Sequence, residues 1–185
     1  MIKEFKAIII GNSGVGKTTF LKRLLNINSS CYNISPTIGL NIESTQISDI
    51  SINFWDTSGQ EKYKSITKNY LRNSSIVVLL FDINDYQTFL DITTFWLDES
   101  KKYAENDAIF YLIANKKDMF KSHPIHRYNN FIKENNLKFF FISSLKDPDF
   151  NQIINNMYSN LNKLEYKPKN NISLYSNFEK NNCCI

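Results

Sequence analysis

The chain of 185 residues is poor in several residue types and patterns, and each scarcity argues against a class of protein. It has three cysteines, two of them adjacent, which is no disulfide framework and fits a reducing cytosol. No apolar run reaches the ~18 residues that a membrane-spanning helix needs. The start, Met1-Ile2-Lys3-Glu4-Phe5, lacks a signal-peptide pattern. The net charge of +4 comes from dispersed basic residues, so we expect a solvated face and no nucleic-acid surface.

Length and composition favour one globular α/β domain with an ample core. The hydrophobic content of 42% is that of a folded protein, and the chain leaves no room for a second domain of similar size. We expect the domain to span residues 1–165. Residues 166–185 contain Pro168, many asparagines and few apolar residues without helical regularity, which predicts a flexible tail.

Strand-like and helix-like segments alternate along the domain. We expect strands at residues 5–10, 40–47, 50–55, 76–82, 109–114 and 139–142. We expect helices at residues 17–25, 61–71, 88–103, 125–135 and 150–164. The run from Ile76 to Phe81 is apolar throughout, as a parallel strand covered on both faces requires. The second and third strands predict an antiparallel hairpin at the edge of the sheet, and Phe89, Ile92, Trp96 and Tyr103 have the spacing of core residues on one helix face.

Glycine is also scarce, with five in the chain, yet three lie in the run Gly11-Asn-Ser-Gly-Val-Gly-Lys17-Thr18. This run matches G-x-x-x-x-G-K-[ST], a loop whose N–H groups converge on nucleotide phosphates, and it stands between an apolar strand and a predicted helix. Lys17 is expected to reach the β- and γ-phosphates, and the Thr18 hydroxyl to ligate Mg²⁺. The residues expected at the phosphates are Asn12, Ser13, Gly14, Val15, Gly16, Lys17, Thr18 and Thr19.

The tetrapeptide Asn115-Lys116-Lys117-Asp118 indicates which base is bound. It follows the strand-like run at residues 108–114. A carboxylate fixed there accepts hydrogen bonds from guanine N1–H and N2–H₂ but would face the bare N1 acceptor of adenine, which favours guanine by several kcal/mol. Alone, such a tetrapeptide would more often be a charged turn. Downstream of a phosphate loop it predicts guanine recognition by Asn115, Lys116 and Asp118.

A third element is Trp55-Asp56-Thr57-Ser58-Gly59-Gln60-Glu61. Asp56 ends a predicted strand and is placed to hold Mg²⁺ through water, as acidic residues of phosphoryl-transfer sites do. Gly59 can bring its N–H to a γ-phosphate, and Gln60 can orient an attacking water. By itself the segment would more simply be a strand followed by a turn. Together with the two motifs above, it predicts a site for Mg²⁺ and the γ-phosphate.

With these motifs the chain resembles the small GTPases, and most closely the Rab family, from about residue 5 to about residue 163. The stretch from Trp55 through Thr67, followed by Tyr70-Leu71-Arg72, resembles the Rab switch II, and Pro36-Thr37-Ile38-Gly39 resembles switch I. The resemblance implies a three-layer P-loop GTPase fold: a six-stranded, mostly parallel sheet with one antiparallel edge strand and five helices on both faces. It implies that Gln60, Lys17 and Thr37 are catalytic, and that Thr18, Thr37 and Asp56 hold Mg²⁺.

The resemblance also has departures. The guanine-cradling loop of the family, S-A-K, aligns without gaps to Ser143-Ser144-Leu145, and the Ser144 N–H could donate to guanine O6. Leu145 stands where the family has a lysine whose stem packs on the base. A shift of the alignment by one residue would assign this packing to Lys146, at the cost of a gap. In the aromatic triad that Rabs use at the switch interface, Trp55 and Tyr70 fit, and Ile42 stands where a phenylalanine is usual.

The tail ends Cys183-Cys184-Ile185 and resembles Rab tails that carry two geranylgeranyl groups on adjacent cysteines. A CaaX box needs cysteine fourth from the end, where this chain has Asn182. Two lipids give stable membrane residence where one gives marginal binding. The adjacent pair thus predicts attachment to the cytoplasmic face of an intracellular membrane, in exchange with the cytosol.

The function implied is that of a switch that cycles between GTP and GDP, hydrolyses GTP slowly and recruits effectors in vesicle trafficking. The implied partners are an exchange factor, a GTPase-activating protein, a GDI-type prenyl-binding escort and effectors that bind switches I and II. An alternative is a guanine-nucleotide-binding scaffold whose hydrolysis has little physiological weight. A metabolic kinase with the same phosphate loop is more distant, because Asn115 and Asp118 would then be unexplained.

Overall fold

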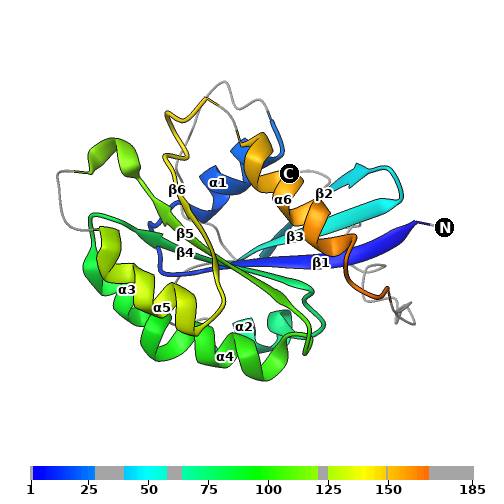
Figure 1. Cartoon of the computed structure of the whole chain (residues 1–185), viewed down its shortest axis with the longest axis horizontal. Helices are drawn as coiled ribbons and strands as arrows, with labels where there is room; N and C mark the ends of the chain where they lie inside the picture. The colour runs from blue at the N-terminus through cyan, green and yellow to red at the C-terminus, as the bar shows by residue number, and fades with distance from the viewer. Residues whose placement is uncertain (1, 28–39, 58–63, 121–124, 149, 167–185) are drawn as a thin grey trace, which may run out of the picture.

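The structure, a computed structural model, describes residues 2–27, 40–57, 64–120, 125–148 and 150–166 (Figure 1). Within these ranges the chain forms a six-stranded sheet in the order β2-β3-β1-β4-β5-β6. The strands are β1 (Lys3–Ile10), β2 (Leu40–Ile47), β3 (Ile50–Thr57), β4 (Ile76–Asp82), β5 (Ile109–Asn115) and β6 (Lys138–Phe141). β2 runs antiparallel to β3, and every other neighbouring pair is parallel. The predicted mostly parallel sheet with an antiparallel edge strand is therefore confirmed.

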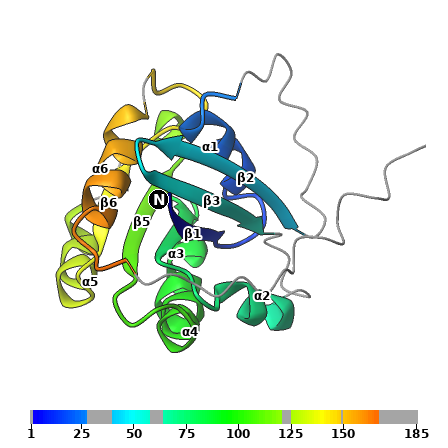
Figure 2. The ribbon, with the colours of Figure 1, turned by 90° about the vertical axis from the view of Figure 1, so that its right-hand side faces the viewer.

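The burial of each strand follows from its place in the sheet. β4 lies in the middle and is buried from Ile76 to Phe81, because helices cover both of its faces. β2 forms one edge, where the β2–β3 hairpin lies open at the side of the molecule (Figure 2), and its sequence LNIESTQI has no fully buried residue. The two-residue link between the hairpin strands contains Ser48 at a positive φ of 55°.

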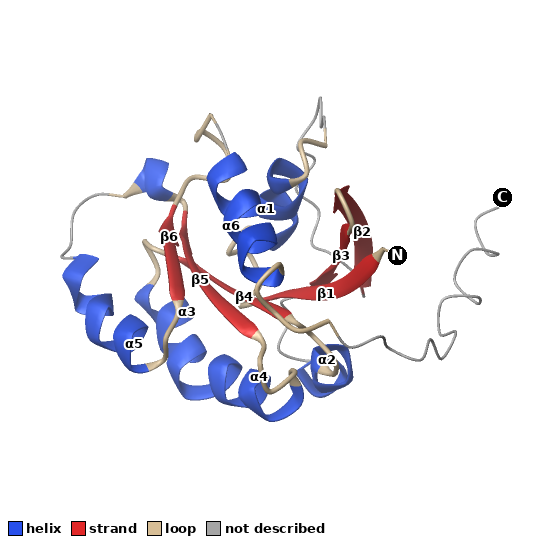
Figure 3. Cartoon of the chain, turned by 45° about the vertical axis from the view of Figure 1, so that its right-hand side comes forward, coloured by secondary structure: helices blue, strands red, loops and turns tan. Residues whose placement is uncertain are grey.

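Helices cover both faces of the sheet (Figure 3). On one face lie α1 (Lys17–Leu24) and α6 (Asn151–Leu161). The other face carries α2 (Lys64–Leu71), α3 (Tyr86–Asp91), α4 (Leu97–Tyr103) and α5 (Asn129–Glu134). The short helices are η2 (Ile92–Trp96), η3 (Lys117–Met119) and η4 (Ile125–Tyr128).

Three of the predicted helices differ in detail from regular α-helices. The helix expected at 88–103 runs from Tyr86 to Tyr103, and its middle turn, η2, is a π-helix. The helix expected at 125–135 begins as the 3₁₀ turn η4 and ends at Glu134, where Asn136 adopts a positive φ of 51°. The last residues of the helix expected at 150–164 form a tighter turn, in which the Leu164 N–H donates to the Leu161 carbonyl at 3.1 Å.

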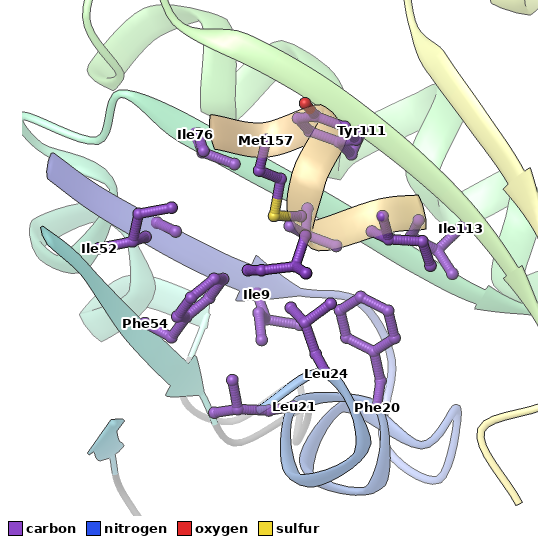
Figure 4. Close-up of a cluster of buried hydrophobic side chains, with 14 of the residues drawn as sticks. Ile9, Phe20, Leu21, Leu24, Ile52, Phe54, Ile76, Tyr111, Ile113 and Met157 are labelled. Carbon is purple, nitrogen blue, oxygen red and sulfur yellow. The ribbon is translucent and has the colours of Figure 1, made fainter. Parts of the chain in front are cut away.

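Each face of the sheet has its own hydrophobic core. On the α1/α6 face, Phe20, Leu21 and Leu24 of α1 and Met157 of α6 lie against sheet side chains (Figure 4). The labelled sheet residues in this cluster are Ile9, Ile52, Phe54, Ile76, Tyr111 and Ile113. The opposite core contains Phe89, Ile92 and Trp96, which confirms that these residues pack in the core. Among the described helices, none combines the length and apolarity needed to cross a lipid bilayer.

The topology gathers the polar motifs at one edge of the sheet. The carboxyl ends of β1, β3, β4, β5 and β6 all lie at the same edge because these strands are parallel, and ligands bind at that edge in open α/β sheets. β1 leads into Gly11, β3 carries Asp56 near its end, and β5 ends at Asn115. The three motifs found in the sequence are therefore neighbours in space.

Candidate functional site: a nucleotide-binding edge of the sheet

The loop between β1 and α1 has a backbone that only glycine allows at two positions. Gly11 has a φ of +142°, and a Cβ there would lie 2.1 Å from the Leu80 carbonyl oxygen. Gly16 has a φ of +97°, and its Cβ would lie 2.6 Å from Asn115 Nδ2. The glycines thus let the loop approach β4 and the Asn115 side chain more closely than any other residue could.

Lys17 turns back over this loop from the first residue of α1. The side chain is buried, and Nζ donates to the carbonyls of Gly11 at 3.0 Å and Asn12 at 2.9 Å. Burial lowers the pKa of Lys17 to about 8, against the opposing effect of the Asp56 carboxylate. The first turn of α1 has no acidic residue and no side-chain cap, so its N–H groups and Lys17 together form a place for an anion.

Asp56 lies beside this anion site, and one of its two carboxylate oxygens accepts no hydrogen bond from the residues that the structure describes. Its Oδ2 accepts from Thr18 Oγ1 at 2.6 Å, while Oδ1 is buried with no hydrogen-bond partner among the described residues. Burial raises the pKa of Asp56, although Thr18 and Lys17 act in the opposite direction. A carboxylate and a hydroxyl next to a phosphate site are the oxygen ligands that Mg²⁺ prefers. Thr18 and Asp56 therefore fit the Mg²⁺ predicted there.

Asn115 connects the phosphate loop to the loop that follows β6. Its buried side chain donates from Nδ2 to the Val15 carbonyl at 2.8 Å. Its Oδ1 accepts from the Ser144 N–H at 3.0 Å and from Ser144 Oγ at 2.9 Å. The Ser144 N–H that was predicted to meet guanine O6 thus donates to Asn115 in this structure, and a base at this position must compete with that bond.

Asp118 is held as a charged acceptor. Its carboxylate accepts from Ser143 Oγ at 2.6 Å, and this hydrogen bond holds the pKa of Asp118 below its usual range. Lys146 Nζ lies 3.8 Å from the other carboxylate oxygen. An ionised carboxylate only accepts hydrogen bonds, which suits the two adjacent N–H donors of guanine.

The residues of the loop after β6 differ in their contacts with Asn115 and Asp118. Ser143 contacts Asp118 and Ser144 contacts Asn115. Leu145 is exposed, whereas Lys146 is the residue whose charge faces Asp118. Lys116 adopts a positive φ of 63°, and its Nζ pairs with Asp82 at 2.8 Å.

Sequence reasoning missed three contributors to this edge. Asp147 accepts from the Ser143 N–H at 2.8 Å and so shapes the loop that follows β6. Asp91 and Trp96 both contact the side chain of Asn12. An acidic residue four positions after Ser143 was a visible sign of the first, but nothing local in the sequence marks the other two. Of the predicted residues, Thr37, Gly59, Gln60, Cys183 and Cys184 lie outside the described residues.

A cavity of about 450 Å³ lies at the opposite end of the parallel strands, near the starts of β1, β4 and β5, and shares no residue with this site. Its walls include Glu4 and Phe5 at the start of β1 and residues 104–107 before β5. The polar constellation at the carboxyl edge, and not this cavity, is therefore the candidate site.

Comparisons with known proteins indicate the family to which the chain is similar. A family model described as the Ras family matches residues 6–163. A probable Rab-related GTPase of Acanthamoeba polyphaga mimivirus is 30% identical over 89% of this chain and 79% of its own. Ras-related protein RabC of Dictyostelium discoideum is 26% identical over 97% of both chains. Ras-related protein RABC2b of Arabidopsis thaliana is 36% identical over 67% of this chain and 62% of its own.

We expect Asn115→Ala to destabilise the nucleotide-free protein by about 2–4 kcal/mol, because it leaves the Val15 carbonyl and the Ser144 N–H buried without partners. Ser144→Ala is the matched control: it removes one hydroxyl from the same contact and should cost about 1 kcal/mol. Urea unfolding of the three proteins measures both values. Equal losses of unfolding free energy in the two variants would show that the hydrogen bonds of Asn115 to Val15 and Ser144 contribute no more to stability than the Ser144 hydroxyl alone.

Proposed function

The chain belongs to the Ras family as a divergent Rab-type small GTPase, and we propose that it cycles between GTP and GDP to recruit effectors in membrane trafficking. The observation that carries the proposal is the pairing of a phosphate site at Lys17 with a charged, acceptor-only Asp118. Asn115 ties the two together through Val15 and Ser144. Members of the family bind guanine nucleotides with Mg²⁺, and Thr18 and Asp56 are the described residues that fit this ion.

The chemistry assigned to the site is hydrolysis of the terminal phosphate of GTP. Thr18, Asp56 and Thr37 would hold Mg²⁺, which would supply neutralisation of the phosphate charge when bound. Lys17 and the loop N–H groups stabilise negative charge that develops on the departing GDP. Gln60 orients the attacking water in line with the bond that breaks. Loss of the γ-phosphate releases the contacts of Thr37 and Gly59, which is the switching event that effectors read.

Replacement of Asp118 by Asn tests the base assignment. An amide at this position presents a donor to the 2-position of the base, so Asp118→Asn should lose GTP affinity by about 10³-fold or more and gain relative affinity for xanthosine nucleotides. Competition binding with GTP, XTP and ATP measures the preference. Equal binding of ATP and GTP by the unmodified protein would remove the basis of the proposal.

Single-turnover hydrolysis distinguishes the switch from the scaffold. We expect an intrinsic rate on the order of 10⁻⁴ s⁻¹, which a Rab-directed activating protein raises by about 10⁵ when it supplies an arginine. Gln60→Leu should bind GTP as the unmodified protein does but resist this acceleration, because only the positioning of water is lost. If the activating protein leaves the rate of the unmodified protein unchanged while GTP binds tightly, the scaffold alternative is correct.

The proposal extends to lipid attachment at Cys183 and Cys184 and to residence on the cytoplasmic face of an intracellular membrane. The adjacent cysteines and the resemblance of the tail to Rab tails support it. We expect Cys183→Ser combined with Cys184→Ser to leave GTP binding intact and to move the protein to the cytosol, since two lipids supply the stable anchor. Fractionation and mass spectrometry of the tail peptide measure this, and two free thiols in the native protein would contradict it.

A further inference from the structure

The helix from Tyr86 to Tyr103 contains a π turn that no helix-breaking residue explains. The turn η2 has the sequence ITTFW, without proline or glycine. Thr93 Oγ1 and Thr94 Oγ1 both donate to the Leu90 carbonyl at 2.8 Å. Side-chain bonds of this kind compete with the regular backbone ladder and favour a local change of pitch. Single π turns inside α-helices are frequent at functional sites, so the contacts of this turn are informative.

The π turn brings two side chains to the phosphate loop. Asp91 and Trp96 are five residues apart and would point about 140° away from each other on a regular α-helix. The i→i+5 bonding of the π turn brings residues at this spacing closer to one line along the helix. Both side chains here contact Asn12: its Nδ2 donates to Asp91 Oδ2, and its Oδ1 accepts from Trp96 Nε1 at 3.0 Å.

The contacts around Asn12 use both ends of its amide. Gln87 Nε2 donates to the second oxygen of Asp91 at 3.0 Å, so that carboxylate also has a partner at each oxygen. Trp96 is buried in the core on this face of the sheet, which fixes the position of its indole N–H. The main-chain carbonyl of Asn12 accepts a hydrogen bond from Lys17 Nζ at 2.9 Å. The side chain that the helix holds therefore belongs to the residue whose backbone holds Lys17.

We propose that Asp91 and Trp96 are positioning residues for the phosphate loop, and that their hold on Asn12 slows the release of bound guanosine diphosphate. The inference rests on the proposed nucleotide binding and goes beyond it, because neither residue belongs to the loop or to the motifs that contact nucleotide. A loop fixed from the side keeps Lys17 and its N–H groups in one arrangement, so less order must be gained when phosphates bind.

Reversal of the Asn12–Asp91 pair provides the test. Asn12→Asp alone places two carboxylates within hydrogen-bond distance and should raise the GDP dissociation rate about tenfold or more. Combination with Asp91→Asn should restore the rate to within about threefold, because the amide now lies at position 91 and donates in the opposite direction. The carboxylate at position 12 still accepts from Trp96 Nε1. If the new carboxylate acted directly on the phosphates, the second substitution would not restore the rate.

Two further variants separate positioning from folding. Trp96→Phe keeps most of the buried ring and removes the N–H, and it should raise GDP dissociation by about three- to tenfold. Ser100→Ala is its control: it removes a buried hydrogen bond of 2.6 Å to the Trp96 carbonyl on the same helix without contact to Asn12, and should leave the rate unchanged. Thermal unfolding of the nucleotide-free variants shows how much stability each has lost.

Failure of this inference differs from failure of the proposed function. If GDP binds and the Asn12→Asp/Asp91→Asn double variant dissociates as fast as Asn12→Asp, the positioning role is wrong and guanine-nucleotide binding stands. If Trp96→Phe and Ser100→Ala raised the GDP dissociation rate equally, the hydrogen bond from Trp96 to Asn12 would have no positioning role beyond the packing of the helix. If the unmodified protein binds no GDP, the proposed function itself fails.

Discussion

The buried amide of Asn115 is the contact on which the nucleotide edge of this sheet depends. It bridges the Val15 carbonyl in the phosphate loop and the Ser144 N–H in the loop after β6. These groups lie 100 and 29 residues away in the sequence, so one side chain joins two loops that are distant along the chain. It also accounts for Gly16, because a Cβ there would lie 2.6 Å from Asn115 Nδ2. The glycine, the asparagine and the small residue at 144 therefore constrain one another.

A second support reaches the same loop from the helix between Tyr86 and Tyr103. The middle of that helix contacts the side chain of Asn12. Closer to its carboxyl end, Glu99 pairs with Lys68 of α2 at 3.2 Å. α2 follows residues 58–63, where Gly59 and Gln60 lie. The phosphate loop and α2 thus both contact the helix from Tyr86 to Tyr103.

The sequence predicts the parts of this arrangement that depend on local pattern. β2 and β4 have the expected bounds, because continuous or alternating apolar residues mark strands directly. The phosphate-loop and N-K-x-D residues lie together, since parallel strands bring their carboxyl ends to one edge. The π turn was not predicted, because the spacing of Phe89, Ile92 and Trp96 fits a regular helix. Its contacts with Asn12 span 79 and 84 residues, and no local pattern records contacts of that range.

The loop after β6 is held in shape without its side chain at Leu145, the position where the resemblance to Rab proteins predicts lysine. The loop is fixed by its own polar bonds: the Ser143 N–H donates to Asp147 at 2.8 Å, and the Lys146 N–H donates to Ser143 Oγ at 3.0 Å. The same Ser143 hydroxyl donates to Asp118. None of these bonds uses the side chain at 145, which is 49% exposed. The position of Asp118 is therefore tied to Ser143 and Asp147 and does not depend on the side chain at position 145.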